Sequence, residues 1–336
     1  MSLIRNCIIK RNNKKVPVWF MRQAGRYLPE FREIRKKNPN FIELCLNRNL
    51  VPEITLQPIK RFNLLDAAII FSDILMIPHA LGQKVEFKKD FGPILNEIDI
   101  DKTLKIDEIE FTKNLLPVYD SMKIISSNEI IKNKDTIGFV GAPWTLLVYM
   151  LNKKSPKKEI SKEILDNKSL VKSLLNIIDK FTKLHIKNQI DNGATLIQIF
   201  DSWAGLLKEE NEISELIYDP TLSLVDYVKS LNTPVICFPR GIKNYELYCK
   251  IVSPDAINID YEIEPKNIEK KIKIPVQGGL DPKILLTDKE NLKKEALKYL
   301  NIFKDHPYIF NLGHGVLPET NPEDMGYLVE IVNNFK

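Results

Sequence analysis

The chain has 336 residues, of which 44% are hydrophobic and 28% charged, with four cysteines and a net charge of +5. This composition excludes a disordered or disulfide-stapled chain, and the positive excess is too weak to indicate a nucleic-acid partner. The N-terminus lacks the apolar core of a signal peptide, and no run reaches the ~18 apolar residues of a membrane helix. We therefore expect a cytoplasmic protein with reduced cysteines.

Short apolar runs rich in β-branched residues recur eight times along the chain. They lack strict alternation, which is typical of strands buried on both faces of a parallel sheet. Helical segments separate most of them, so the sequence predicts an α/β fold, a single-domain (β/α)8 barrel over residues 1–336. A doubly wound open sheet is the alternative. The runs are Val18–Met21, Ala67–Phe71, Ile137–Val140, Leu196–Phe200, Val235–Phe238, Ile257–Ile259, Pro275–Gln277 and Tyr308–Phe310.

Other elements are marked by turn and capping signals. A polar excursion over Lys84–Phe91 indicates a hairpin inserted after the second strand. Three helices carry boundary signals, namely a glycine beyond the end, a capping box, and a proline in the first turn. They are Lys157–Asn192 before Gly193, a helix opened by Thr287-Asp288-Lys289-Glu290 that runs to about Phe303, and the last helix from Asn321-Pro322-Glu323.

The carboxyl ends of the predicted strands hold the unusual polar and aromatic residues. Active sites of α/β barrels lie at this end of the strands. Polar groups that converge with aromatic rings are typical of a small-molecule pocket, which is what we expect here. The segments are Arg22, Ser72-Asp73, Gly141-Ala142-Pro143-Trp144, Asp201-Ser202-Trp203, Pro239-Arg240, Asp260-Tyr261, Gly278-Gly279 and Asn311-Leu312-Gly313-His314-Gly315.

Arginine is scarce and unevenly placed. The chain has 40 lysines and 9 arginines, and eight of these arginines precede residue 62. Four of them, Arg22, Arg26, Arg32 and Arg35, fall within 14 residues. A guanidinium binds carboxylate or phosphate through two parallel hydrogen bonds, which lysine cannot do. Helical ion pairs with neighbouring glutamates would explain Arg32 equally well, whereas Arg22 and Arg26 flank a turn.

Several common chemistries have no supporting motif. The sequence contains no strand followed by GxGxxG, no GxxxxGK[ST], no HExxH or CxxC, and no GxSxG. A lysine Schiff base stays open on composition, although no predicted strand end carries a lysine. What remains is a cluster of Arg, Asp, Tyr, Ser and His without an obvious cofactor.

Five blocks of this sequence resemble the uroporphyrinogen decarboxylase family, and the likeness spans about residues 15–325. The resemblance implies a distorted barrel that forms a homodimer with a deep cleft. It also implies decarboxylation of the four acetate side chains of uroporphyrinogen III, giving coproporphyrinogen III in haem biosynthesis, without a metal or organic cofactor. The blocks are Pro17–Arg32, Phe71–Leu75, Gly138–Leu146, Phe200–Gly205 and Phe310–Asn321.

The resemblance further implies roles for individual residues. Asp73 would stabilise a cation formed by protonating a pyrrole, Tyr149 would lie near the reacting acetate, and Arg22 would hold a carboxylate. The proton donor stays open, because an unperturbed guanidinium is a poor acid. A helix cap for Asp73 or Ser202 and core packing for Tyr149 are the structural alternatives. The substrate-binding residues are predicted to be Arg22, Gln23, Ala24, Gly25, Arg26, Arg35, Asp73, Tyr149, Ser202 and His314.

Two other functions stay open on the sequence. Corrinoid-linked methyltransferases share the barrel, but as a class they bind zinc through a His-x-Cys and a later Cys. This chain has Val235-Ile236-Cys237 at the corresponding strand, and no cysteine follows Cys249. A non-catalytic tetrapyrrole-binding protein would need the arginines but had no reason to retain Asp73 and Tyr149.

Overall fold

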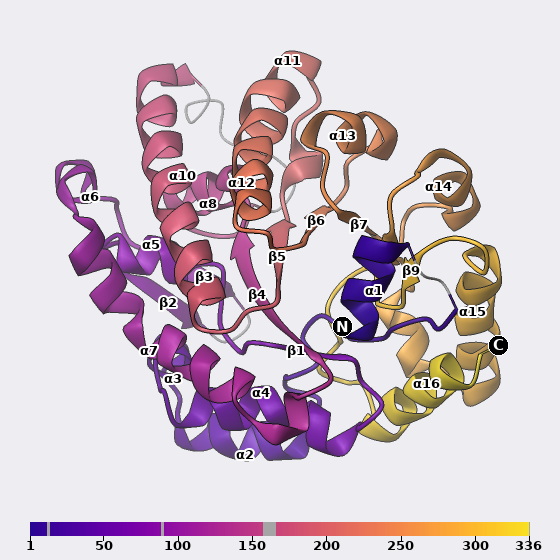
Figure 1. Cartoon of the computed structure of the whole chain (residues 1–336). Helices are drawn as coiled ribbons and strands as arrows, with labels where there is room; N and C mark the ends of the chain where they lie inside the picture. The colour runs from indigo at the N-terminus through magenta and orange to yellow at the C-terminus, as the bar shows by residue number, and fades with distance from the viewer. Residues whose placement is uncertain (12–13, 89–90, 157–165, 336) are drawn as a thin grey trace.

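A curled parallel sheet of seven strands forms the centre of the molecule (Figure 1). The computed structural model describes residues 1–11, 14–88, 91–156 and 166–335. The strands are hydrogen-bonded in the order in which they follow along the chain, which confirms the predicted α/β barrel and is not the order of a doubly wound sheet. They are β1 (Ala67–Ile69), β4 (Asp135–Gly141), β5 (Leu196–Asp201), β6 (Val235–Pro239), β7 (Ala256–Ile259), β8 (Val276–Gly278) and β9 (Tyr308–Ile309).

The segment at residues 17–21 closes the barrel between β9 and β1. Val18 forms a parallel bridge with Phe310, and Trp19 N donates to Phe310 O at 3.3 Å. On the other side, Asp66 N donates to Val18 O at 2.8 Å. The predicted strand Val18–Met21 is thus reduced to a single bridge, because the Asp66 carboxylate accepts the Val18 N–H at 2.8 Å in place of a backbone carbonyl.

Helices surround the strands in Figure 1 and cover the outer face of the barrel. None of the helices in the described ranges combines the length and the apolar character that crossing a bilayer requires. The helices outside α1 are α2 (Pro29–Lys37), α3 (Phe41–Cys45), α4 (Leu50–Arg61), α5 (Met76–Ala80), α6 (Ile100–Lys105), α7 (Glu108–Ser126), α8 (Pro143–Asn152), α10 (Lys168–Asp191), α11 (Glu210–Ile213), α12 (Asp219–Ser230), α13 (Tyr245–Val252), α14 (Pro265–Lys271), α15 (Lys289–Ile302) and α16 (Pro322–Asn334).

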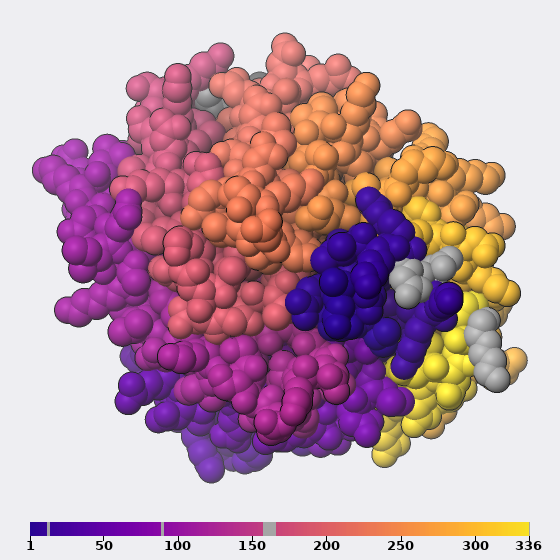
Figure 2. All heavy atoms as spheres, viewed as in Figure 1, coloured from indigo at the N-terminus to yellow at the C-terminus, as the bar shows by residue number. Residues whose placement is uncertain are grey.

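The N-terminal helix α1 (Leu3–Lys10) closes the end of the barrel at which the strands begin. Its buried residues Ile4, Cys7 and Ile8 join a cluster of apolar side chains from inside the barrel. Arg5 Nε pairs with Asp135 Oδ1 at 2.8 Å, at the first residue of β4. Figure 2 shows the indigo N-terminal segment on this face, right of centre and beside the yellow C-terminal part of the chain. Ligands therefore approach the polar residues from the opposite end.

The predicted hairpin is present and is longer than expected. Strands β2 (Val85–Lys88) and β3 (Gly92–Leu95) pair in antiparallel fashion, which extends the hairpin beyond Phe91. Because β1 is the second strand of the barrel after residues 17–21, its position agrees with the prediction. The hairpin lies outside the barrel sheet, to which it is not hydrogen-bonded.

The predicted helix Lys157–Asn192 is only partly correct. Residues 157–165 lie outside the described residues, and α10 begins at Lys168. Asn167 marks the break, because its side chain accepts a hydrogen bond from Leu170 N at 3.2 Å and caps α10. The end is confirmed: Gly193 follows with a positive φ of 111°, a conformation that favours glycine.

The capping box at Thr287 is also wrong by one residue. Asp288 is the N-cap of α15 and accepts from Asn291 N at 2.8 Å, whereas the Thr287 hydroxyl donates backwards to Ile284 O at 2.8 Å. Aspartate competes well for this position because its charge also complements the helix dipole. The start of α16 is confirmed, with Asn321 accepting from Glu323 N at 3.0 Å.

Candidate active site

The loop that follows residues 17–21 presents Arg22 at the carboxyl end of the barrel. Arg22 adopts a positive φ of 61°. Met21 N donates to Asn311 Oδ1 at 3.1 Å, and Val316 N donates to Met21 O at 2.9 Å. A Cβ at Gly315 would lie 2.4 Å from Arg22 Cδ. The first and last sequence blocks therefore fix the arginine together, and glycine at residue 315 leaves room for its side chain.

Gln23 points inward and holds this loop in place. Its Oε1 accepts from Phe20 N at 3.0 Å, and its Nε2 donates to Ala67 O of β1 at 2.9 Å. The side chain is buried, while Ala24 and Gly25 beside it are half-buried. The structure thus gives Gln23 a positioning role, and substrate contact by Gln23, Ala24 and Gly25 stays a prediction.

The remaining arginines of the first block have different surroundings. Arg26 is exposed. The Arg35 guanidinium lies 5.6 Å from the centre of the Phe41 ring, and burial together with the charge of Arg26 lowers its pKa. Arg32 donates to the carbonyl oxygens of Arg26 and Tyr27, both at 3.0 Å, so the suggested helical ion pairs are not what holds it. The Arg32 side chain is exposed.

Asp73 follows β1 and lies close to Arg22. Burial raises the pKa of its carboxyl group from 3.8 to about 6, while a hydrogen bond from Leu75 N and the charge of Arg22 act in the opposite direction. The hydrogen bond is 2.9 Å long and uses Oδ1. Asp73 thus fixes the turn before α5 but does not cap this helix, whose N-cap is Leu75, so the structural alternative is wrong. The second oxygen of Asp73 takes no part in that bond.

Tyr149 projects from α8 toward the same place. Its hydroxyl lies 3.4 Å from Ser155 Oγ, and its ring contacts Trp203 edge-on with 5.8 Å between the centres. Burial raises the pKa of the Tyr149 hydroxyl, with the charge of Asp73 contributing. Arg22 also acts on both groups electrostatically. The structure therefore brings together the three residues predicted to be catalytic.

Ser202 and His314 lie at the ends of β5 and beyond β9. Ser202 lines a cavity of about 180 Å³ and does not cap the short helix that follows, so the structural alternative for it is wrong. Burial, together with the charges of Arg22 and Arg240, lowers the pKa of His314 to about 4. The imidazole is consequently neutral at physiological pH.

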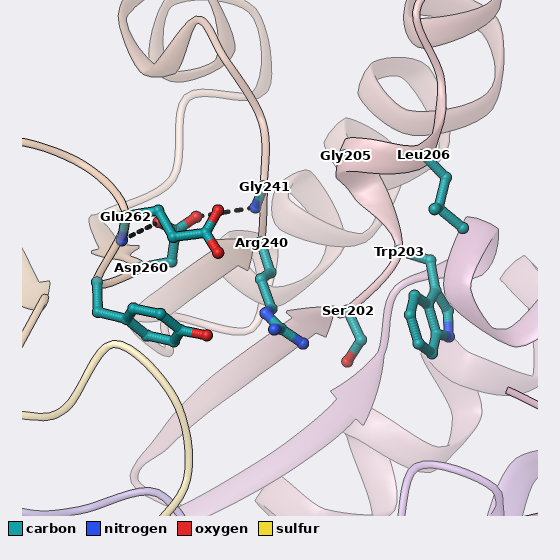
Figure 3. A pocket seen from close by; sticks show the side chains of 9 residues that line it. Ser202, Trp203, Gly205, Leu206, Arg240, Gly241, Asp260 and Glu262 are labelled. Carbon is teal, nitrogen blue, oxygen red and sulfur yellow. Dashed lines mark hydrogen bonds between the residues drawn. The ribbon is translucent and has the colours of Figure 1, made fainter. Parts of the chain in front are cut away.

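Arg240 was noted at the end of a predicted strand but was not among the predicted substrate-binding residues. It follows β6, lines the same cavity as Ser202, and its charge lowers the pKa of both Arg22 and His314. In Figure 3 its side chain extends into the same hollow as Ser202. It is the one arginine after residue 61, and that isolation in a lysine-rich chain was a usable signal.

The arginines of the cleft are not held in ion pairs, although the charge of Asp73 acts on Arg22. The Arg22 side chain is accessible to water. Protein atoms nevertheless surround it, and the resulting desolvation lowers its pKa. Both properties are expected of a group inside a deep concave site. Within the described part of the chain, Arg22, Arg26 and Arg240 form no ion pair with a carboxylate. Such a cluster favours a ligand that carries several negative charges.

Fold and site together define an α/β-barrel protein with a cationic cleft built around a half-buried carboxyl group. The family model described as "Uroporphyrinogen decarboxylase (URO-D)" matches residues 2–335. The chain belongs to the uroporphyrinogen decarboxylase family.

Curated relatives agree along the whole length. The uroporphyrinogen decarboxylase of Rickettsia felis is 43% identical over 334 residues, covering 98% of this chain and 96% of the relative. That of Rickettsia bellii is 44% identical over 342 residues, covering 100% and 99%. Among solved structures, a methyltransferase from Methanosarcina mazei has a TM-score of 0.78 at 15% identity, covering 100% and 99% of the two chains. At that identity the likeness shows the fold alone.

The zinc-dependent alternative depends on the thiol of Cys237. This cysteine is buried within β6, and burial raises its pKa well above the ordinary value. Zinc is bound by the thiolate form, so this environment opposes metal binding. Among the residues that the structure describes, no three His, Cys, Asp or Glu side chains are grouped to hold a metal.

Proposed function

We propose that this protein decarboxylates the four acetate side chains of uroporphyrinogen III and releases coproporphyrinogen III and carbon dioxide in haem biosynthesis. The observation that carries the proposal is the joint position of Asp73, Arg22 and Tyr149 in one cleft, in a chain that matches the decarboxylase family over residues 2–335. A pure binding protein would need the cationic groups alone.

Substrate binding follows from charge. Uroporphyrinogen carries eight carboxylates, and a guanidinium binds a carboxylate through two charge-assisted hydrogen bonds. Arg22 and Arg26 supply such groups without a competing carboxylate partner among the described residues. Burial lowers the pKa of Arg22, and an incoming carboxylate relieves this cost of desolvation.

The chemical step requires a place for the electrons of the broken bond. When the pyrrole is protonated on its ring carbon, it becomes a cation that accepts the electron pair as the acetate loses carbon dioxide. A second proton then converts the exocyclic methylene into a methyl group, and the ring carbon releases the first proton, which restores the neutral pyrrole. Asp73, ionised above its pKa of about 6, stabilises the cation and accepts the pyrrole N–H bonds.

Two neighbours refine this step. The Tyr149 hydroxyl, whose pKa is raised by burial, stays protonated and donates a hydrogen bond near the reacting acetate. His314 enters neutral, because its pKa is about 4, and serves as a hydrogen-bond partner for a carboxylate.

The direct test is anaerobic turnover of uroporphyrinogen III by the purified protein in the presence of a chelator. Products are oxidised to porphyrins and separated by carboxylate number. We expect seven-, six-, five- and four-carboxylate species to form in succession. If the folded protein binds the substrate and no carboxylate is lost, the catalytic proposal is wrong and the tetrapyrrole-binding alternative replaces it.

We further propose that residues 1–336 act as one domain, that two copies form a homodimer in the cytoplasm, and that neither nucleic acid nor a metal or organic cofactor takes part. The net charge of +5 is modest for a chain of this length, in line with a small-molecule enzyme. Light scattering after size-exclusion chromatography tests the dimer, since a monomeric mass at micromolar concentration would contradict it.

A further inference from the structure

The loops after β5 and β6 are joined so that Arg240 faces the cleft. Arg240 N donates to Asp201 O at 3.0 Å, and Gly205 N donates to Arg240 O at 3.0 Å. A Cβ at Gly205 would lie 2.6 Å from Gly241 O, so the two loops are in close contact. This contact fixes the backbone of Arg240 beside Ser202 rather than leaving it on a free loop.

Two carboxylates, Asp260 and Glu262, line the same cavity as Arg240, and neither forms an ion pair with it. The Asp260 oxygens accept from Gly241 N at 2.9 Å and from Glu262 N at 3.0 Å (Figure 3), and also from the Tyr245 hydroxyl at 3.2 Å. Asp260 is buried, whereas Arg240 is half-buried and forms no ion pair with any residue described by the structure. The guanidinium therefore lies ready for an external anion.

The cavity in front of Arg240 has the size of one side arm. Its volume is about 180 Å³, several times the roughly 30 Å³ that a water molecule occupies in the liquid. Ser202 and Tyr261 add polar groups to its lining, and Trp203 adds an aromatic ring. A carboxyalkyl chain fits this chemistry, with methylenes beside the ring and the carboxylate at the guanidinium.

Arg240 and Asp73 lie at the ends of different strands. Arg240 follows β6 and Asp73 follows β1, and β4 and β5 lie between these two strands in the sheet. A carboxylate that is about to leave as neutral carbon dioxide gains nothing from a tight ion pair, because the pair stabilises the ground state more than the transition state. An arginine that two strands of the sheet separate from the strand before Asp73 therefore suits an arm that does not react.

We propose that Arg240 binds a propionate arm of the tetrapyrrole and so fixes the substrate while an acetate reacts at Asp73. This inference rests on the proposed function. The acetates are lost one after another, so only the propionates remain available to one fixed clamp through all four reactions. Arg240 thereby contributes to recognition of the ring in each partly decarboxylated intermediate.

The test compares Arg240→Gln with Arg240→Lys and with the control Arg11→Gln. Arg11 is exposed at the end of α1, on the opposite end of the barrel, and its replacement removes the same charge. Coproporphyrinogen III is the informative probe, because it carries four propionates and no acetate. Its dissociation constant is measured by anaerobic calorimetric titration, beside kcat and KM for uroporphyrinogen III.

For Arg240→Gln we expect both the dissociation constant and KM to rise about tenfold to a hundredfold, with kcat changing less than threefold. Arg240→Lys should recover part of the loss, and Arg11→Gln should equal wild type. If only KM rises, Arg240 binds an acetate, and if neither constant changes, it does not contact the substrate. Either result overturns the proposal.

Failure of the proposed function is distinguishable from failure of this inference. Wild-type protein that binds coproporphyrinogen but releases no carbon dioxide would refute the decarboxylase reaction alone, and the titrations would still report on Arg240. The thermal midpoint of each variant is measured first. If Arg240→Gln does not fold, Arg240→Lys keeps the charge, and unchanged binding by that variant would contradict two-bond recognition of the propionate.

Discussion

The position of Arg22 is decided by a glycine nearly 300 residues away in the sequence. Gly315 packs against the arginine side chain so closely that any Cβ would lie 2.4 Å from Arg22 Cδ. The backbone at Arg22 is itself in the left-handed region, with φ of 61°. This conformation is unfavourable for a non-glycine residue, and it occurs at functional sites where the surrounding structure enforces the backbone geometry.

Replacing Gly315 by alanine should therefore move Arg22 out of the cleft. We expect kcat/KM for uroporphyrinogen III to fall about a hundredfold, because a displacement near 1 Å disrupts alignment of substrate and catalytic groups. Gly326→Ala is the matched control, since its nearest neighbour would lie at 3.5 Å, an ordinary contact. Equal activity of the two variants would show that Arg22 needs no such support.

Asp73 should make activity and stability depend on pH in opposite directions. Its folded pKa of about 6 exceeds the ordinary 3.8, so the fold disfavours the ionised form. This destabilisation is absent below pH 3.8, grows as the pH rises to 6, and is complete above it. Turnover needs the ionised form, so kcat/KM should fall about tenfold per pH unit below 6.

The Asp73→Asn variant separates the two effects. It should lose turnover by at least about a hundredfold while melting at a higher temperature than wild type at pH 7. The difference in melting temperature should shrink toward pH 4, where the wild-type carboxyl group is protonated. A variant that melts lower than wild type at pH 7 would show that the carboxylate stabilises the fold.

At the scale of elements, the sequence predicted strands and their ends better than helix starts. Strand positions follow from runs of apolar residues; seven of the eight runs form strands in the expected order, and the eighth forms a single bridge. The shortening of Val18–Met21 depends on the Asp66 side chain, which tertiary contact alone brings to the Val18 N–H. Likewise, Asn167 and Lys168 continue a helical pattern, and only the capping bond shows that a new helix begins there.

Some residues of the candidate site could likewise be predicted from the sequence, whereas others depend on tertiary contacts. Arg22 and Asp73 could be recognised because they stand in distinctive sequence blocks, and Tyr149 because it lies three residues after the block Gly138–Leu146. Arg240 is preceded by an ordinary strand, and its place in the cleft depends on the register of β6 beside β5 and on the bond from Gly205. The hydrogen bond from Gln23 to Ala67 O also depends on tertiary contact, so the sequence pattern alone could not predict it.

The start of α15 provides a direct test of the corrected cap. Asp288→Ala should lower the free energy of unfolding by about 1 kcal/mol, because the N–H of Asn291 loses its acceptor. Thr287→Ala should cost less, since its hydroxyl bonds to Ile284 O outside the helix. Urea unfolding of both variants measures the difference, and a larger effect at Thr287 would restore the original capping box.

At the scale of the whole molecule, the two ends of the barrel have separate tasks. One end holds the cleft, and the other is closed by α1 through apolar packing and the Arg5–Asp135 pair. Asp135 is fully buried, and its Oδ2 has no hydrogen-bond partner in the structure. Arg5 and the Thr195 hydroxyl, both 2.8 Å from Oδ1, hold this carboxylate in place.

Removing the arginine should reduce stability without touching the chemistry. Arg5→Ala leaves a buried carboxylate without its counter-ion, and we expect a loss of about 2–3 kcal/mol in the free energy of unfolding. Lys10→Ala, an exposed residue of the same helix, should change it by less than about 0.5 kcal/mol. Well below the melting temperature, both variants should turn over substrate at the same rate. A loss of turnover in Arg5→Ala alone would show that the packing of α1 affects the cleft at the other end of the barrel.

Closure of the barrel through Val18 and Phe310 also has a consequence for synthesis on the ribosome. The arginine block is translated first, but the bonds from Met21 to Asn311 and Val316 form only after almost the entire chain has emerged. Until then the nascent sheet keeps an open edge, which a ribosome-associated chaperone would have to shield. A chain cut before residue 310 thus contains every predicted arginine yet has no means of placing Arg22.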